Sequence, residues 1–237
     1  STLNNWLKSQ PDGYIGEGLV NWLSVTRLSK LISDLYQTPK LEYKRINSES
    51  LEEANNQIQK NNPVILQIPG HFFVGNGIIE ESDQPDLYII DPSYNYEKFS
   101  QHKELLLSTR ILEPTFSDLS YIHLSFRSDL NVSVTNVAGE EIENIQFFDD
   151  YLRDFFLDEN VVGGGYTQNN SPITNIIEIE KPTSDIYKIE VSQNKFGPFN
   201  LSIFTYTKSG ELTNLTYSGI VGINKLQLKL IYNNEGI

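Results

Sequence analysis

The 237-residue sequence predicts an α+β domain followed by an all-β sandwich. Helical apolar patterns are confined to about the first 60 residues, and three short apolar runs follow between residues 62 and 95. Those runs are bounded by Gly, Pro, Asn and Asp, which is typical of buried strands. From about residue 127, short alternating runs separated by turn residues predict a sandwich. We therefore expect two domains, at residues 1–120 and 121–237.

The early elements follow from spacing and capping. Leu3, Trp6 and Leu7 lie on one face of a short helix at residues 2–8, and an apolar stripe predicts a longer helix within residues 19–36. A strand is predicted at residues 41–46. Ser50 followed by Glu53 forms a capping box, so a third helix is expected at about residues 51–60.

The three central runs, at residues 63–68, 72–79 and 87–90, are predicted strands. His71 stands at the head of the middle strand, and Asp91 follows the tail of the third. If these two strands are an antiparallel pair, head meets tail and the imidazole faces the carboxylate. A His oriented by a carboxylate is the basic half of a nucleophilic triad, so both residues are candidate catalytic residues.

The remainder of the chain is predicted to be mainly strands. A partly helical segment is expected at residues 103–107 and a loop or short strand at 111–117, followed by a strand at 121–126. Residues 146–157 are interpreted as a helix or as a long insertion. The predicted sandwich strands are residues 131–137, 176–179, 185–191, 199–207, 212–217 and 225–232.

Charge and composition exclude several function classes. The chain has 31 acidic and 18 basic residues, a net charge of -13, which disfavours nucleic acid and anionic membranes as partners. It has no apolar run of 18 residues, so no membrane span is predicted. It contains no Cys, which excludes disulfides and Cys-ligated zinc. No cofactor or metal is predicted.

Residues 1 to about 110 resemble C39-like peptidase domains, which are papain-fold cysteine peptidases. The matching landmarks occur in order. They are Leu-Asn-Asn-Trp-Leu-Lys at 3–8, Gly-Leu-Val-Asn-Trp at 18–22, Gly-His-Phe-Phe-Val at 70–74 and Ile-Asp-Pro-Ser at 90–93. The resemblance implies that His71 is the general base and that Asp91 orients it. The stretches at residues 130–139, 182–191 and 197–204 are similar to a β-rich domain that often follows C39-like domains in secreted bacterial proteins, so the resemblance covers residues from about 120 onward.

The chain departs from this family at the nucleophile. The family's Cys, and the Gln that helps to form its oxyanion hole, match no residue here. Gln67 lies on the wrong strand to replace that Gln, and no Gly-x-Ser-x-Gly motif is present. The papain-like domain is therefore expected to be incomplete and the chain inactive by itself. Because the sequence starts at Ser1 and contains no Met, we expect an upstream segment, or another chain, to supply the nucleophile helix.

Several alternatives stay open. The chain is either peptidase-related, with a peptide or protein ligand, or a non-catalytic binding or structural module at the bacterial cell surface or outside the cell. An enzyme using a Ser is a third hypothesis. His102 and His123 have no carboxylate at ligand spacing, so surface or core positions are expected. Acidic residues near residue 150 could bind calcium, but the pattern favours a solvent-exposed acidic face. These residues are Asp149, Asp150, Asp154, Asp158 and Glu159.

Overall fold

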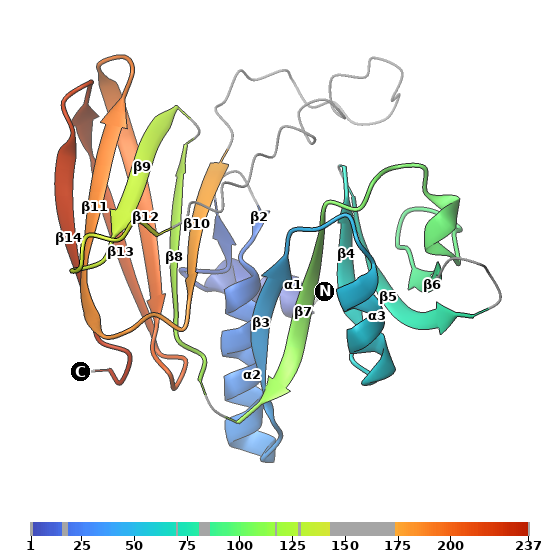
Figure 1. The fold of residues 1–237 in the computed structure, drawn as a ribbon. Coiled ribbons are helices and arrows are strands. Elements are labelled where there is room, and N and C mark those ends of the chain that lie inside the picture. The colour runs from blue at the N-terminus through green and yellow to red at the C-terminus, as the bar shows by residue number, and fades with distance from the viewer. Residues whose placement is uncertain are drawn as a thin grey trace. The chain divides into compact units, whose positions relative to one another are not determined.

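A computed structural model describes residues 2–15, 19–69, 71–80, 86–116, 118–127, 129–142 and 174–236. The fold is rich in β-structure, and the paired strands are antiparallel (Figure 1). Two compact units divide the chain. Residues 39–115 belong to one, here called the sheet unit, and the described parts of 1–38, 116–150 and 167–237 to the other, here called the sandwich unit. The first 38 residues thus group with the sandwich, whereas the sequence predicted that they belong to a first domain at residues 1–120.

The sheet unit contains a five-stranded sheet in the order β3-β7-β4-β5-β6. Helix α3 (Glu52–Gln59) packs on one face through Ala54 and Ile58, which join a core containing Leu66 and Phe73 (Figure 1). The predicted capping box of Ser50 and Glu53 was wrong, because the N-cap is Leu51 without a side-chain cap, and the Ser50 hydroxyl accepts from the Glu52 amide at 3.1 Å. The strands are β3 (Lys40–Ile46), β4 (Val64–Ile68), β5 (His71–Ile79), β6 (Asp86–Ile90) and β7 (Ser108–Thr115).

The predicted helix at residues 103–107 was wrong. A 3-10 helix, η1 (Phe99–Gln101), precedes it, and the chain from residue 102 to 107 has no helical turn. Only Leu106 of its apolar side chains is fully buried, whereas Leu105 is 64% exposed. The Leu107 amide already donates to the Gln67 carbonyl at 2.8 Å. This segment therefore aligns the chain with β4 and leads directly into β7.

A β-bulge interrupts the pairing of β5 with β6. Gly75 pairs with Ile89, but the next pair joins Gly77 to Tyr88, so Asn76 is an extra residue. A Cβ atom at Gly77 would lie 3.1 Å from the Tyr88 ring, which explains the small residue there. Bulges locally bend a strand and re-aim its side chains. Here the bulge lies between the apolar end of β5 and the end that carries His71.

The sandwich unit packs a four-stranded sheet, β10-β8-β12-β13, against a three-stranded sheet, β14-β11-β9. Both sheets contribute to one apolar core, which includes Ile122, Leu124, Ile189 and Leu201. Every strand predicted in this region is present, with shifted ends. The strands are β8 (Tyr121–Arg127), β9 (Leu130–Thr135), β10 (Thr174–Glu180), β11 (Asp185–Gln193), β12 (Gly197–Tyr206), β13 (Leu212–Val221) and β14 (Leu226–Tyr232).

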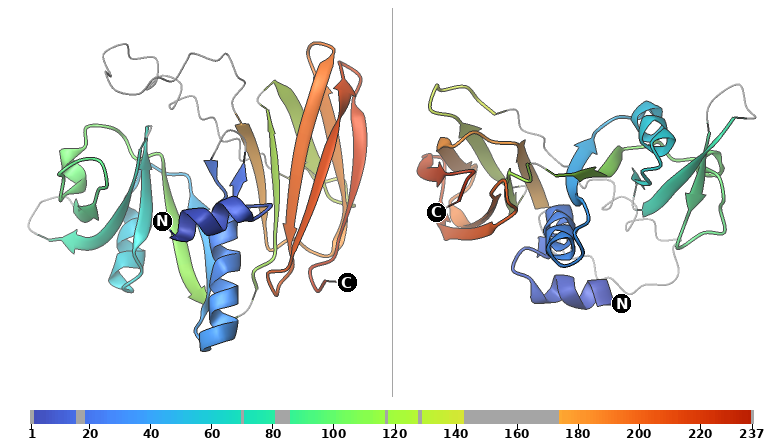
Figure 2. Two further views of the ribbon diagram at one scale, coloured as in Figure 1. Left: turned by 180° about the vertical axis from the view of Figure 1, so that it is seen from behind. Right: turned by 90° about the horizontal axis from the view of Figure 1, so that it is seen from below.

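The first 38 residues contain two helices, α1 (Thr2–Ser9) and α2 (Trp22–Tyr36), and a small hairpin of β1 (Tyr14–Ile15) and β2 (Leu19–Val20). The helices lie side by side (Figure 2), and the Arg27 guanidinium stacks 5.2 Å from the Trp6 ring. Within the described residues, no helix is long and apolar enough to cross a membrane.

A buried polar cluster joins this N-terminal segment to the sandwich. The Tyr206 hydroxyl donates to Asp12 Oδ2 at 3.0 Å and accepts from Asn21 Nδ2 at 3.1 Å, while Arg27 Nε donates to the same carboxylate oxygen at 3.1 Å. Burial raises the pKa of the Tyr206 hydroxyl, and the charge of Asp12 raises it further. The phenol therefore stays protonated and acts as the donor that holds the segment on the outer face of the four-stranded sheet.

Candidate functional site

Strand register brings His71 and Asp91 together. His71 opens β5 and pairs with Ile68 of β4, while Asp91 directly follows β6, whose last residue, Ile90, pairs with Val74. Asp91 therefore lies beside the start of β5. His71 Nε2 is 2.8 Å from Asp91 Oδ1. The contact that the antiparallel arrangement implied is thus present, and the catalytic role drawn from it remains a prediction.

The Asp91 carboxylate is fully enclosed and well supplied with donors. Its side chain is 0% exposed. Besides His71, Oδ1 accepts the backbone amides of Ser93 at 2.8 Å and Tyr94 at 3.0 Å, and Oδ2 lies 3.0 Å from His102 Nε2. Burial alone would raise the pKa of Asp91, but the two backbone amides and His71 outweigh it and lower the pKa below its usual value. The carboxylate is therefore ionised at neutral pH.

An ionised Asp91 determines which nitrogen of each ring carries hydrogen. A carboxylate only accepts, so the Nε2 atoms of His71 and His102 must both donate to it. In a neutral imidazole the other nitrogen, Nδ1, then has the free electron pair. Within the described part of the chain, His71 Nδ1 makes no hydrogen bond, and the side chain is 14% exposed. His71 Nδ1 is thus the basic atom that this arrangement can offer to a reactant.

Aromatic rings hold the two imidazoles differently. The His102 ring stacks on Phe73 with centroids 4.6 Å apart and meets the edge of Tyr96 at 4.9 Å. Its side chain is only 3% exposed. The His71 ring instead has an edge contact with Tyr94 at 5.4 Å and a tilted one with Phe73 at 5.7 Å. His102 is enclosed by the core, whereas His71 lies at the more open end of the cluster.

His102 is the residue that sequence reasoning missed. It was expected to take a surface or core position, because no carboxylate stands at ligand spacing from it in the sequence. The chain after Asp91 instead folds back on β6, with the Ile89 amide donating to the Glu97 carbonyl at 2.9 Å. This return brings residue 102 to the second oxygen of Asp91. A signal for it was the dense aromatic and His composition of residues 94–102, which also contains Tyr94, Tyr96 and Phe99.

Gln67 is excluded from this site by the face of the sheet that it occupies. It pairs with Phe72, and His71 pairs with Ile68, so side-chain alternation puts Gln67 on the opposite face from His71. There the side-chain oxygen of Gln67, Oε1, accepts from the Ser108 hydroxyl at 2.8 Å and from Arg110 Nη1 at 2.9 Å. The Gln67 side chain is therefore part of a hydrogen-bond network with Ser108 and Arg110. It does not take part in the Asp91 site.

The third histidine, His123, lies in the sandwich unit. It is 2% exposed, and its Nδ1 is 3.4 Å from Glu178 Oε1 on the neighbouring strand. Its buried position agrees with the surface or core position expected from the sequence, and the antiparallel register sets it opposite Glu178. The acidic residues from Asp149 to Glu159 and the segment at 146–157 lie outside the described residues. Among the residues that the structure does describe, no group of three or more His, Asp or Glu is arranged to hold a metal ion.

Comparisons of the chain with protein-family models, with curated proteins and with solved structures find no match. The C39-like resemblance therefore rests on the short motifs given above and remains a prediction. The functional interpretation has to come from the geometry around Asp91.

Proposed function

We propose that this chain carries the base and the orienting acid of a C39-like cysteine peptidase site, on an incomplete papain-like domain, and that it does not hydrolyse peptides unaided. The observation that supports this most directly is the 2.8 Å contact between His71 Nε2 and Asp91 Oδ1. Together with an ionised Asp91, it leaves Nδ1 of a partly exposed imidazole as a base.

In the proposed reaction, a thiol from outside these 237 residues attacks the carbonyl carbon of a peptide. His71 Nδ1 takes the thiol proton, and Asp91 stabilises the resulting imidazolium through Nε2. The imidazolium then protonates the departing amine, leaving a thioester. Water attacks the thioester while Nδ1 again accepts a proton, which releases the acid and restores the thiol. The source of the thiol is an upstream segment of a longer protein or another chain.

A second candidate is a non-catalytic binding or structural module, at the bacterial surface or outside the cell. Two observations favour it. The chain has no Cys, and Asp91 makes four hydrogen bonds that would equally serve to lock a loop. In this case His71 and His102 are the donors that satisfy a buried carboxylate.

Cleavage of p-nitrophenyl acetate by added cysteamine distinguishes these candidates. The exogenous thiol replaces the missing nucleophile, and the assay measures whether the chain accelerates its attack. We expect acceleration that is abolished in His71→Ala. The His123→Ala variant is the matched control, because it removes a buried imidazole from the sandwich unit and should keep the full rate.

Equal rates for the unmodified chain and His71→Ala would contradict the proposal and favour the non-catalytic module. A peptide-hydrolysis assay without added thiol is run in parallel. We expect no hydrolysis there. Hydrolysis that disappears in His71→Ala would instead support a Ser nucleophile within the chain.

A further inference from the structure

Two adjacent loops of the sandwich unit, each joining one sheet to the other, expose large apolar side chains. The loop between β11 and β12 carries Phe196, which is 82% exposed. The chain between β13 and β14 carries Ile223, which is 81% exposed, and Ile220 near the end of β13 is 65% exposed. We call these three residues the apolar tip. None of them belongs to the sandwich core, so their exposure is unexplained by folding.

The two loops form one continuous end of the sandwich. The Gln193 amide donates to the Gly222 carbonyl at 3.0 Å, which ties the first loop to the second. A Cβ atom at Gly222 would lie 3.2 Å from Phe196 Cδ2, so the aromatic ring lies against this glycine. Ile220 pairs in register with Pro198, two residues beyond Phe196. The apolar side chains therefore lie close together and do not occur singly.

The charge of this end differs from that of the whole chain. Lys195 directly precedes Phe196 and has no ion pair within the described residues, and Lys225 follows Ile223 by two positions with a 62% exposed side chain. Most of the nearby described charges are paired, and Lys225 also experiences the charge of Glu141. Glu190 lies 2.6 Å from Lys225 and 3.2 Å from Lys188, and Asp129 lies 2.7 Å from Arg127. Within the described residues, Lys195 is thus the cation beside the apolar tip that has no acidic partner, whereas Lys225 is paired with Glu190.

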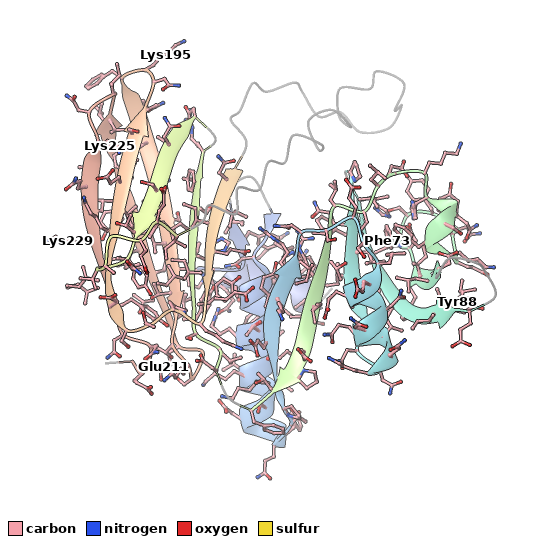
Figure 3. The ribbon with its side chains drawn as sticks, in the orientation of Figure 1. Phe73, Tyr88, Lys195, Glu211, Lys225 and Lys229 are labelled. Carbon is pink, nitrogen blue, oxygen red and sulfur yellow. The ribbon has the colours of Figure 1, made fainter. Side chains whose placement is uncertain are left out.

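At least one acidic residue of the sandwich unit lies far from the apolar tip. Glu211 lies at the opposite end of the sandwich from Lys195 (Figure 3). A ten-residue strand such as β12 spans about 33 Å, which exceeds the screening length of about 8 Å at physiological ionic strength. A partner that touches only the apolar tip therefore meets its lysines and is shielded from acidic residues at the far end.

We propose that the apolar tip inserts into the interfacial layer of a lipid bilayer that contains anionic headgroups. The apolar side chains lie on two loops and a strand end at one end of the sandwich, where a deformable lipid surface can reach them. Transfer of Phe and Ile side chains out of water is favourable, and neighbouring lysines can keep their ammonium groups at the headgroups. Anionic lipid supplies the complementary charge. This inference is independent of the peptidase proposal, since it uses no residue of the Asp91 site.

Flotation of the full chain with lipid vesicles tests this inference. Vesicles of phosphatidylcholine and phosphatidylserine are compared with vesicles of phosphatidylcholine alone. We expect binding to the mixed vesicles that weakens with added salt, and a loss of about tenfold or more in the double variant Phe196→Ser/Ile223→Ser. The matched control is Ile186→Ser/Ile231→Ser. These two residues pair at the other end of the sandwich, and Ile231 is 79% exposed.

Three outcomes would overturn the inference. The first is no binding of the unmodified chain to the mixed vesicles. The second is equal loss of binding in the control variant, which would indicate a general effect of surface hydrophobicity. The third is sedimentation of the unmodified chain as an oligomer that the tip variant alone dissociates, without vesicle binding, since the tip would then contact a second copy of the chain. The His71→Ala variant should bind vesicles normally.

Discussion

Two sites in this molecule pair an imidazole with a carboxylate, and they differ in how the acid is held. In the sheet unit, Asp91 accepts from two backbone amides and two imidazoles. In the sandwich unit, His123 Nδ1 approaches Glu178 at 3.4 Å, and neither ring nitrogen of His123 makes a hydrogen bond within the described residues. The first site fixes the tautomer of its histidines, whereas the second does not.

The position along the strand explains the difference. His123 lies within β8 and is flanked by Glu178 of β10 and Phe204 of β12, so both sides of the ring are covered by neighbouring strands. His71 opens β5, and its acid lies in the loop after β6, where free backbone amides can reach the carboxylate. A strand end thus supplies both the donors that orient an acid and an opening beside the base.

Replacing each acid with Ala tests this comparison with the largest expected effect. Asp91→Ala leaves two backbone amides and two histidines without their acceptor, so we expect the sheet unit to lose about 2–4 kcal/mol of stability. Glu178→Ala should cost the sandwich unit less, about 1–2 kcal/mol, because His123 makes no hydrogen bond to lose.

The two units can be followed separately. Both tryptophans, Trp6 and Trp22, lie in the sandwich unit, so their fluorescence in urea reports on that unit. Amide hydrogen exchange of β5 and β6 reports on the sheet unit. An Asp91→Ala variant with unchanged exchange in β5 would show that the carboxylate does not organise this end of the sheet.

Acid should weaken the sheet unit through the same carboxylate. The pKa of Asp91 is lower in the folded chain than its usual value, because the backbone amides and His71 overcome the effect of burial. The stabilisation is therefore complete above the unfolded pKa, about 3.9, and is lost as the pH falls through the lower folded pKa. Hydrogen exchange of β5 measured from pH 6 to pH 3 should show this loss in the unmodified chain. It should be smaller in Asp91→Asn, and identical profiles would refute the assignment.

The sequence predicted the strands more reliably than the surroundings of the site. Short apolar runs with turn residues at their ends located β4, β5 and β6, and the adjacency of His71 and Asp91 followed from antiparallel pairing alone. Pairing of consecutive strands depends on local pattern, which is present in the sequence. The β-rich sandwich followed from alternation for the same reason.

Other features depend on contacts between distant residues. The link between Asp12 and Tyr206 spans most of the chain and has no periodic signature, so the grouping of residues 1–38 with the sandwich could not be predicted. The position of His102 depends on an irregular loop, and the expected helix at residues 103–107 gave way to backbone pairing with Gln67. The spacing of residues in the sequence predicts neither the position of His102 nor the loss of the helix at 103–107, because both depend on packing.

Replacing histidines with phenylalanine gives an intermediate effect that sharpens the comparison. His102→Phe keeps a ring that can stack on Phe73 but removes the donor to Asp91 Oδ2, so we expect a loss of about 2 kcal/mol in the sheet unit. His123→Phe removes no hydrogen bond and should change the sandwich unit by less than about 1 kcal/mol. Urea unfolding followed by hydrogen exchange and by fluorescence measures the two values. Equal losses would contradict the distinction between the sites.

A smaller effect than that of His102→Phe is expected from Tyr206→Phe. This change removes one donor from Asp12, but Arg27 keeps its hydrogen bonds to the same carboxylate, so the cost should be about 1 kcal/mol. The loss should be visible in tryptophan fluorescence, because Trp22 opens α2 in the attached segment. Hydrogen exchange in β5 serves as the control and should stay unchanged.

Nitrogen NMR of the His71 ring measures the central claim directly. Long-range correlations from ring carbon-bound hydrogens distinguish a protonated Nε2 from a protonated Nδ1. We predict that His71, in its neutral form, carries hydrogen on Nε2 and has a bare Nδ1, and that Asp91→Asn shifts the population toward the other tautomer. A hydrogen on Nδ1 in the unmodified chain would contradict the claim that Asp91 orients His71 as a base. The same tautomer population in the unmodified chain and in Asp91→Asn would contradict it too.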